Sequence, residues 1–426
     1  MPYTGAGTGQ GPCLLSSVPP QDDRRRTGAH GGLQGRGTGA SQKRSFAAAP
    51  RGGACVAATK GGLEDVIACT TEICAIDGQR GRLVYRGYDA DELAGRVSFE
   101  EVAHLLWTGA LPEPAELQDL GAGLRAAAHL PAGVVDLLTT LPRTTGMAAL
   151  RTAVSALGHF DPDTPERSPA TNRGKAIRLT AEVAAVVAAW WRLGQGQPVL
   201  APRADLGHAA NFLYLLSGNV PGPLHARAMD TALVLHADHE LNASTFAARV
   251  TAATLAGMHA AVTAAIGALE GPLHGGANEA VMHALQEIGR PEHADAWVRS
   301  ELAVGRKIPG FGHRVYRTTD PRAAVLADLA RRLGEESGDT LPYRITLALD
   351  GAVRRQRGLF PNVDLYSGGV YRALGIPCAL FTPVFAVSRV SGWTAHIMEQ
   401  YGHNRLIRPR AQYVGPTRRE VSRHTY

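Results

Sequence analysis

Cysteine is scarce in this chain of 426 residues, which contains only five. Their number is odd and none belongs to a Cys-x-x-Cys pair, so a disulfide scaffold is disfavoured and reduced thiols are expected. Cys69 and Cys74 lack a second Cys/His pair at zinc-finger spacing, and His236 and His239 lack a further ligand. We therefore expect no metal site.

Strongly apolar runs are missing as well. Residues 250–269 carry no charged side chain, but they contain many alanines and threonines and are too weakly apolar for lipid. They are better explained as a buried, closely packed helix. The first residues do not form the apolar core of a signal peptide. We therefore expect no membrane partner.

Acidic side chains are few at the N-terminus. The net charge is +6, but residues 1–58 hold seven Lys or Arg residues against two Asp, so the rest of the chain is nearly neutral and no nucleic-acid partner is expected. The same residues are glycine-rich and lack apolar periodicity, which predicts a disordered Gly/Arg-rich extension. We interpret it as a flexible tail, or as the product of a misplaced start codon, and expect a cytoplasmic protein. The alternative is a transit peptide and a location in the mitochondrial matrix.

Aromatic residues make up only 6% of the chain, and polar–apolar alternation is rare. Alanine and leucine, which lose little entropy on entering a helix, are abundant instead. Short strands are expected within 66–76 and 83–85, and Ser98 with Glu101 predicts a capping box. The sequence thus predicts an all-α, mainly α-helical fold with short N-terminal strands. Apolar spacing predicts helices over residues 100–107, 115–127, 134–140, 147–157, 172–193, 206–217, 229–236, 244–269, 278–288, 321–333, 343–354 and 385–399.

Three motifs carry residues that can do chemistry. The first, GPLHGGAN at 271–278, interrupts a helical pattern, so His274 is expected just before a helix N-terminus. The helix dipole there disfavours a cationic imidazole, which favours a neutral hydrogen-bond donor. Gly275 and Gly276 would let a ligand approach closely. Taken alone, the motif is better explained by a histidine that caps a loop.

The other two motifs add a second histidine, arginines and a carboxylate. In PGFGHRVYRTTDPR, at 309–322, His313 precedes Arg322, which lies in the first turn of a helix begun by Asp320 and Pro321. A guanidinium at this position suits a carboxylate ligand. In FPNVD, at 360–364, Asp364 lies at a loop-to-helix junction, where a capping role is the alternative. Each motif is weak alone.

Together the motifs resemble the citrate synthase family. HADHELNAST at 236–245, the three motifs above and IRPRAQYVG at 407–415 occur in the family's order and spacing, and GRLVYRGYDADELA at 81–94 is similar to its N-terminal region. The resemblance covers roughly residues 62–415. It implies a large helical domain (62–275 and 376–415), a small helical domain (276–375) and a homodimer with the site between the domains. It also implies that no cofactor is needed beyond the substrates.

The resemblance further implies a reaction and a set of roles. Acetyl-CoA would condense with oxaloacetate and water to give citrate and CoA. His274 would hydrogen-bond the thioester carbonyl, Asp364 would remove the α-proton and His313 would polarise the ketone of oxaloacetate. The residues that would hold the oxaloacetate carboxylates are His239, Arg322, Arg389 and, from the partner subunit, Arg408. The residues that would bind CoA are Lys307, Ile308, Pro309, Gly310, Arg314 and Asn362.

Two other functions remain open at this point. The 2-methylcitrate synthases use propionyl-CoA with the same residue types, and one extra methylene is worth only ~1–3 kcal/mol of discrimination in an apolar pocket. A non-catalytic regulatory paralogue would keep the fold but is expected to lose His274, His313 or Asp364, all of which are present.

Overall fold

The computed structural model of the protein describes residues 61–63 and 66–419, so the extension predicted at 1–58 lies outside the described residues. The chain divides into two units, Met1–Val66 and Ile67–Tyr426. Within its described residues the first unit contributes only the 3₁₀ turn η1 (Gly61–Leu63). The second unit holds every other described element.

The second unit begins with a small antiparallel sheet of three strands in the order β1 (Cys74–Asp77), β2 (Arg82–Tyr85) and β3 (Tyr88–Asp89). Cys74 pairs with Tyr85, which confirms the predicted strands. The turn between β1 and β2 contacts a distant segment, because the Arg317 N–H donates to the Gly78 carbonyl at 2.9 Å. Gly78 must lack a side chain, since a Cβ there would collide with the Val315 carbonyl. The hairpin therefore supports the loop that carries His313.

The rest of this unit is helical, which confirms the predicted fold class. Short 3₁₀ turns, η2 (Pro291–His293) and η3 (Cys378–Leu380), accompany the helices. The α-helices within the described residues are α1 (Ala90–Leu93), α2 (Phe99–Thr108), α3 (Pro114–Ala127), α4 (Ala132–Thr140), α5 (Gly146–Leu157), α6 (Pro169–Gly194), α7 (His208–Ser217), α8 (Pro223–His236), α9 (Ala243–Ala252), α10 (Met258–Leu269), α11 (Ala277–Ile288), α12 (Ala294–Ala303), α13 (Pro321–Ser337), α14 (Leu341–Arg357), α15 (Val363–Ala373) and α16 (Phe381–Gly402).

The prediction of one continuous helix over 244–269 is wrong, because the structure has two helices there. The chain turns back between α9 and α10, which pack against each other, and Leu255 adopts a left-handed φ of 64° in the turn. Gly257 then precedes the first turn of α10. Apolar periodicity runs through both helices and does not reveal the break. The capping box of Ser98 and Glu101 at the start of α2 is confirmed.

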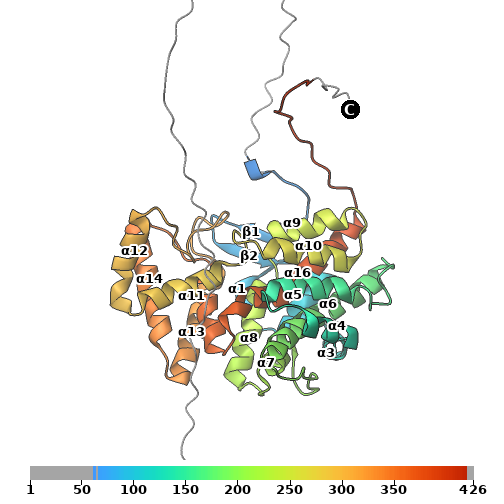
Figure 1. Ribbon diagram of the computed structural model, residues 1–426, viewed down its shortest axis with the longest axis horizontal. Coiled ribbons are helices and arrows are strands. Elements are labelled where there is room, and N and C mark those ends of the chain that lie inside the picture. The colour runs from blue at the N-terminus through green and yellow to red at the C-terminus, as the bar shows by residue number, and fades with distance from the viewer. Residues whose placement is uncertain (1–60, 64–65, 420–426) are drawn as a thin grey trace, which may run out of the picture. The chain divides into compact units, whose positions relative to one another are not determined.

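Helix α16 is the centre of the core. Almost every side chain from Phe381 to Ile397 is buried, and Trp393 and Arg389 are the largest fully buried ones. A helix covered on all sides must be enclosed by others, and α16 packs against α2, α6, α8, α9 and α10. Figure 1 shows α11, α12, α13 and α14 gathered on one side of this unit and α3, α4 and α6 on the other. No helix of the described residues is long and apolar enough to cross a membrane.

Candidate active site

His274 lies in the turn between α10 and α11, just before the helix N-terminus, where the sequence predicted it. Its Nε2 is 2.9 Å from the Ser244 hydroxyl, which also accepts a 3.1 Å bond from the Trp393 indole N–H. Burial and the nearby Arg389 lower the pKa of His274 to about 4. The imidazole is therefore neutral at pH 7, and Ser244 fixes its orientation.

His313 and His239 form a second cluster with Tyr316. The ring centroids of His239 and His313 are 5.1 Å apart, and His239 Nε2 lies 3.3 Å from the Tyr316 hydroxyl. The backbone N–H groups of Val315 and Tyr316 donate to His313 Nδ1 at 3.0 and 3.2 Å. Since Nδ1 accepts these bonds, the ring proton of neutral His313 is on Nε2. His313 thus presents a neutral N–H donor, because burial and Arg322 lower its pKa to about 4.

His313 and Tyr316 line a pocket of about 210 Å³. The chain shortly before Asp364 also lines this pocket. Burial, Arg322 and His313 hold the pKa of His239 well below its ordinary value, so this ring is neutral too. The pocket lining consists of Gly312, His313, Tyr316, Arg317, Thr318, Asp320, Gly358, Leu359, Phe360 and Pro361.

Two buried arginines provide positive charge, and they differ in how they are held. Arg322 is 2% exposed and is paired with Asp320 through two bonds of 2.9 and 2.7 Å, so its pKa stays raised despite burial. Arg389, on α16, is 1% exposed and donates from Nε to the His236 carbonyl at 2.7 Å. Among the described residues its Nη2 has no hydrogen-bond partner, and burial lowers its pKa. A buried guanidinium with a free N–H is a binding position for an anionic ligand.

Asp364 is the second residue of α15 and is partly buried. Asn362, rather than Asp364, caps the helix, since the Asn362 side chain accepts the Asp364 N–H at 3.0 Å. Burial raises the pKa of Asp364 to about 6, although Arg322 and Arg389 favour its ionised form. A carboxyl group with this pKa is a suitable general base near neutral pH. The capping alternative considered for Asp364 is therefore wrong.

The charges of the two buried arginines link His274 to the cluster of His239, His313 and Tyr316. Arg322 and Arg389 both act on Asp364, Arg389 also acts on His274, and Arg322 acts on His313. The structure therefore brings together six of the residues expected in the site. They are His239, His274, His313, Arg322, Asp364 and Arg389.

The backbone expected to lie near CoA is a tight glycine-containing turn. Gly310 and Gly312 have φ values of 83° and 76°, which favour glycine. The turn is tied to the start of α15, because the Asn362 N–H donates to the Gly310 carbonyl at 3.0 Å and its side-chain amide donates to the Gly312 carbonyl at 3.0 Å. Asn362 and Gly310 thus have structural tasks of their own.

The remaining expected ligand residues lie outside this cluster. Lys307 and Arg314 are exposed, Pro309 is partly buried and Ile308 is buried among core side chains. Arg408 is exposed beyond α16, and within the described part of the chain no hydrogen bond or ion pair joins it to the six residues. Within a single chain, then, the structure does not bring Arg408 to the site.

Comparison with known proteins shows the family of this chain. The family model described as citrate synthase, C-terminal domain, matches residues 62–410. This chain belongs to the citrate synthase family. Citrate synthase 2 of Bacillus subtilis is 48% identical over 361 residues, covering 84% of this chain and 96% of the relative. The 2-methylcitrate synthase of Mycobacterium tuberculosis is 44% identical over 361 residues, covering 84% and 91%.

A solved structure of the family is also similar. The ternary complex of carboxymethyl coenzyme A and oxaloacetate with citrate synthase from Thermoplasma acidophilum matches with a TM-score of 0.81. It is 35% identical and covers 85% of this chain and 97% of its own. The similarity thus extends over nearly the whole length of that citrate synthase.

Several polar residues of the site were not found from the sequence. Tyr316 stands three positions after His313, and Ser244 stands two positions after Asn242, the N-cap of α9, but neither position signals a contact with a histidine. Asp320 was interpreted only as a helix start, although it also pairs with Arg322. In the described part of the chain no group of three or more His, Cys, Asp or Glu side chains has the arrangement of a metal site.

Proposed function

We propose that this chain condenses acetyl-CoA with oxaloacetate and water to give citrate and CoA. The observation that carries the proposal is the combination of Asp364, whose pKa is raised to about 6, with the neutral rings of His274 and His313. A base and two uncharged N–H donors are what an enol-forming condensation requires.

In this proposal the reaction begins at the acetyl methyl group. A thioester α-proton is too weakly acidic for a free carboxylate to remove quickly. Asp364 takes that proton while His274 donates a hydrogen bond to the thioester oxygen, which stabilises the enol that forms. The Ser244 hydroxyl holds the His274 ring during this step.

The enol carbon then attacks the ketone of oxaloacetate. His313 is suited to donate from Nε2 to the developing alkoxide, because its Nδ1 is already occupied by two backbone N–H groups. Arg322, Arg389 and His239 hold the carboxylates. The unpartnered Nη2 of Arg389 supports this role, since an oxaloacetate carboxylate would satisfy it.

Hydrolysis of the citryl thioester comes after condensation. We infer a large domain (62–275 and 376–415) and a small domain (276–375) whose closure excludes water until the carbon–carbon bond has formed. Packing among α11, α13, α14 and α15, all within 276–375, supports the smaller domain. Lys307, Ile308, Pro309, Gly310, Arg314 and Asn362 are proposed to line the CoA path.

We also propose a homodimer in which Arg408 of one subunit completes the site of the other. Its exposure and the lack, within the described part of its own chain, of a hydrogen bond or ion pair to the six site residues support a task elsewhere. Mixing Asp364→Asn chains with Arg408→Ala chains tests this arrangement. Hybrid dimers would contain one intact site, so activity should recover to about a quarter of the normal value. No recovery, with both variants dimeric by light scattering, would assign Arg408 to its own chain or to no site.

The acyl group is the remaining choice, because a 2-methylcitrate synthase is nearly as similar as a citrate synthase. The test is CoA release by the purified protein with oxaloacetate and either acetyl-CoA or propionyl-CoA. A preference for acetyl-CoA supports the proposed reaction, and a preference for propionyl-CoA assigns 2-methylcitrate formation to the same residues. Release with neither substrate would favour a non-catalytic paralogue.

We further infer a cytoplasmic location. The support is the composition of residues 1–58, whose many glycines do not suit the amphipathic helix of a mitochondrial transit peptide. Fractionation of cells that produce the full-length protein tests this location.

A further inference from the structure

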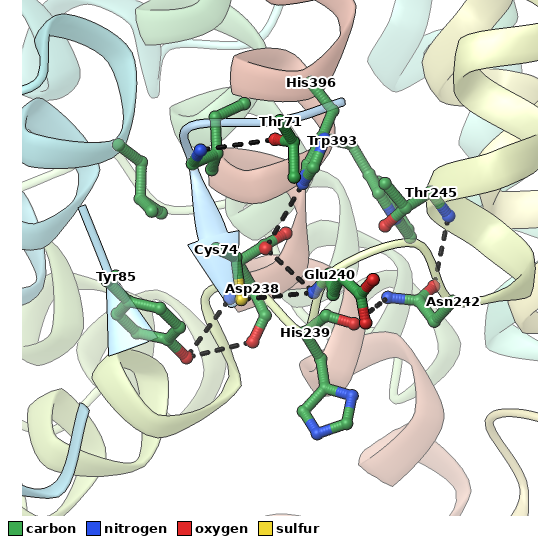
Figure 2. Close-up of polar contacts among 12 residues, drawn as sticks. Thr71, Cys74, Tyr85, Asp238, His239, Glu240, Asn242, Thr245, Trp393 and His396 are labelled. Atoms are coloured by element: carbon green, nitrogen blue, oxygen red, sulfur yellow. Dashed lines mark hydrogen bonds and ion pairs between the residues drawn. The ribbon is translucent and has the colours of Figure 1, made fainter. Parts of the chain in front are cut away.

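The segment that carries His239 has a strained backbone. Glu240, the next residue, has a φ of 52°, which is uncommon for a residue with a side chain. Such a conformation persists only where surrounding contacts over-determine it. Figure 2 shows the His239 ring directed away from a set of polar side chains that hold this segment from behind.

Asp238 is the centre of that set. It is 0% exposed, and its Oδ2 accepts the Glu240 N–H at 3.1 Å and lies 3.3 Å from His396 Nε2 (Figure 2). The Tyr85 hydroxyl donates to the Asp238 carbonyl at 3.0 Å. The side chain and the backbone carbonyl of Asp238 are therefore both held by hydrogen bonds. The bond to the Glu240 N–H stabilises the strained φ directly.

His396, on α16, contacts Asp238 as a single tautomer. The Arg249 guanidinium donates to His396 Nδ1 at 3.0 Å, so the Nδ1 position carries no proton. The proton of the neutral ring is then on Nε2, where it is donated to Asp238. Arg249 is held in turn by Glu399 at 2.5 Å, and Glu399 accepts the Glu72 N–H at 2.8 Å. The chain of bonds thus runs from the segment just before β1 to the His239 segment.

One face of α16 organises both halves of the site. Arg389, Gly392, Trp393 and His396 follow one another at helical spacing. Gly392 donates its N–H to the Ala237 carbonyl at 3.1 Å, and a Cβ at Gly392 would collide with that carbonyl and with the Asp238 carboxylate. The same face therefore presents Arg389, supports Ser244 through Trp393 and clamps Ala237–Asp238.

We infer that Asp238 and His396 are positioning residues that aim His239 at oxaloacetate. This inference rests on the proposed function, which makes His239 a ligand of a substrate carboxylate. His396 and Arg389, from α16, hold the pKa of Asp238 below its ordinary value despite burial, so Asp238 is an ionised acceptor for both N–H groups. Loss of that acceptor would leave the buried His396 N–H unsatisfied and the Glu240 N–H with only its bond to the Cys74 sulfur at 3.2 Å, and would release the turn at Glu240.

The test measures oxaloacetate binding to the full-length protein by calorimetry, alone and in a double-mutant cycle. Asp238→Ala should weaken oxaloacetate binding by about tenfold to a hundredfold, and His239→Ala by a similar factor. In the His239→Ala background, Asp238→Ala should add less than about twofold, because it acts through a ring that is already gone. The KM for the acyl-CoA should stay within about twofold in Asp238→Ala.

Two sets of variants separate positioning from general stability. Asp238→Asn keeps an acceptor oxygen and should restore most of the affinity that Asp238→Ala loses. Asp230→Ala is the matched control, since Asp230 on α8 also accepts a backbone N–H, that of Phe99 at 3.0 Å, outside the site. Its oxaloacetate affinity should be unchanged. If Asp238→Ala does not fold, His396→Gln should retain affinity, because an amide can both accept from Arg249 and donate to Asp238, whereas His396→Phe should lose it.

The outcomes separate this inference from the proposed function. Normal oxaloacetate affinity in Asp238→Ala and His396→Phe, with weakened affinity in His239→Ala, would overturn the positioning role and leave the function standing. Additive losses in the double mutant would also overturn it, because they would mean that Asp238 acts independently of His239. Normal affinity in His239→Ala would remove His239 from the oxaloacetate site and with it this inference.

Discussion

The polar groups along α16 and the turn at residues 307–314 contribute to the proposed site in opposite ways. Arg389 and His396 are almost completely buried, and each is oriented by a specific hydrogen bond. Lys307 and Arg314 are exposed, and the turn between them owes its shape to glycines with positive φ. The buried region can therefore discriminate a small dianion by geometry, whereas the exposed side chains of Lys307 and Arg314 can adapt to a long, flexible ligand.

The largest effect is expected where the buried region meets the chemistry. Asp364→Asn should lower kcat by about a hundredfold to ten-thousandfold, because the amide cannot remove the α-proton. Oxaloacetate binding should persist, since the arginines are unchanged. Steady-state CoA release and oxaloacetate calorimetry measure the two quantities. Near-normal turnover in this variant would show that another group is the base.

The same substitution should stabilise the protein at alkaline pH. The pKa of Asp364 is raised to about 6 in the folded state, so its contribution to stability is present below its unfolded pKa and is lost as the pH rises through about 6. At pH 8 the ionised carboxylate destabilises the fold, and Asp364→Asn should raise the free energy of unfolding by on the order of 1 to 3 kcal/mol. The gain should vanish near pH 4, which denaturant titrations at the two pH values can check.

Substitutions of the two buried arginines should both weaken oxaloacetate binding but should differ in their effect on the stability of the fold. Arg322→Ala leaves Asp320 buried without its partner and should destabilise the fold by roughly 3 to 5 kcal/mol as well as weaken oxaloacetate binding. Arg389→Gln removes a cation that already has an unpartnered N–H, so it should weaken oxaloacetate binding about a hundredfold with a smaller loss of stability. Thermal unfolding and calorimetry on both variants test the contrast. Equal destabilisation would mean that the charge of Arg389 matters as much to the buried Asp238 as the charge of Arg322 does to Asp320.

The pH dependence of kcat/KM should follow the titration of Asp364 and not that of the two histidines. Since the pKa of Asp364 is about 6 and those of His274 and His313 are about 4, kcat/KM for the acyl-CoA should fall as the pH drops below 7. At pH 5 it should be roughly a tenth of its plateau value, because only the ionised carboxylate is active. An unchanged rate down to pH 5 would require a base with an ordinary carboxyl pKa.

The sequence predicts this site unevenly, for physical reasons. His274 and His313 lie in glycine-containing turns and Asp364 lies in the first turn of α15, and such local patterns can be read from a single stretch of chain. The pair of Asp238 and His396 cannot, because 158 residues separate them and only packing of α16 brings them together. Trp393 was likewise indistinguishable from any apolar residue of a buried helix, and its bond to Ser244 appears only in three dimensions. The break between α9 and α10 was missed because apolar spacing continues through it.

The smallest effects are expected in the exposed turn, where two glycines allow a matched comparison. Gly310 and Gly312 both have positive φ, but a Cβ at Gly310 would lie 3.1 Å from the Leu365 backbone, whereas one at Gly312 would meet open space. Gly312→Ala therefore carries only backbone strain, and Gly310→Ala adds a clash with α15. The KM for the acyl-CoA should rise about twofold in Gly312→Ala and several-fold more in Gly310→Ala, with oxaloacetate affinity unchanged in both. If both variants instead lost oxaloacetate affinity, the turn would belong to the same rigid frame as α16, and the division between a fixed buried region and an adaptable exposed one would fail.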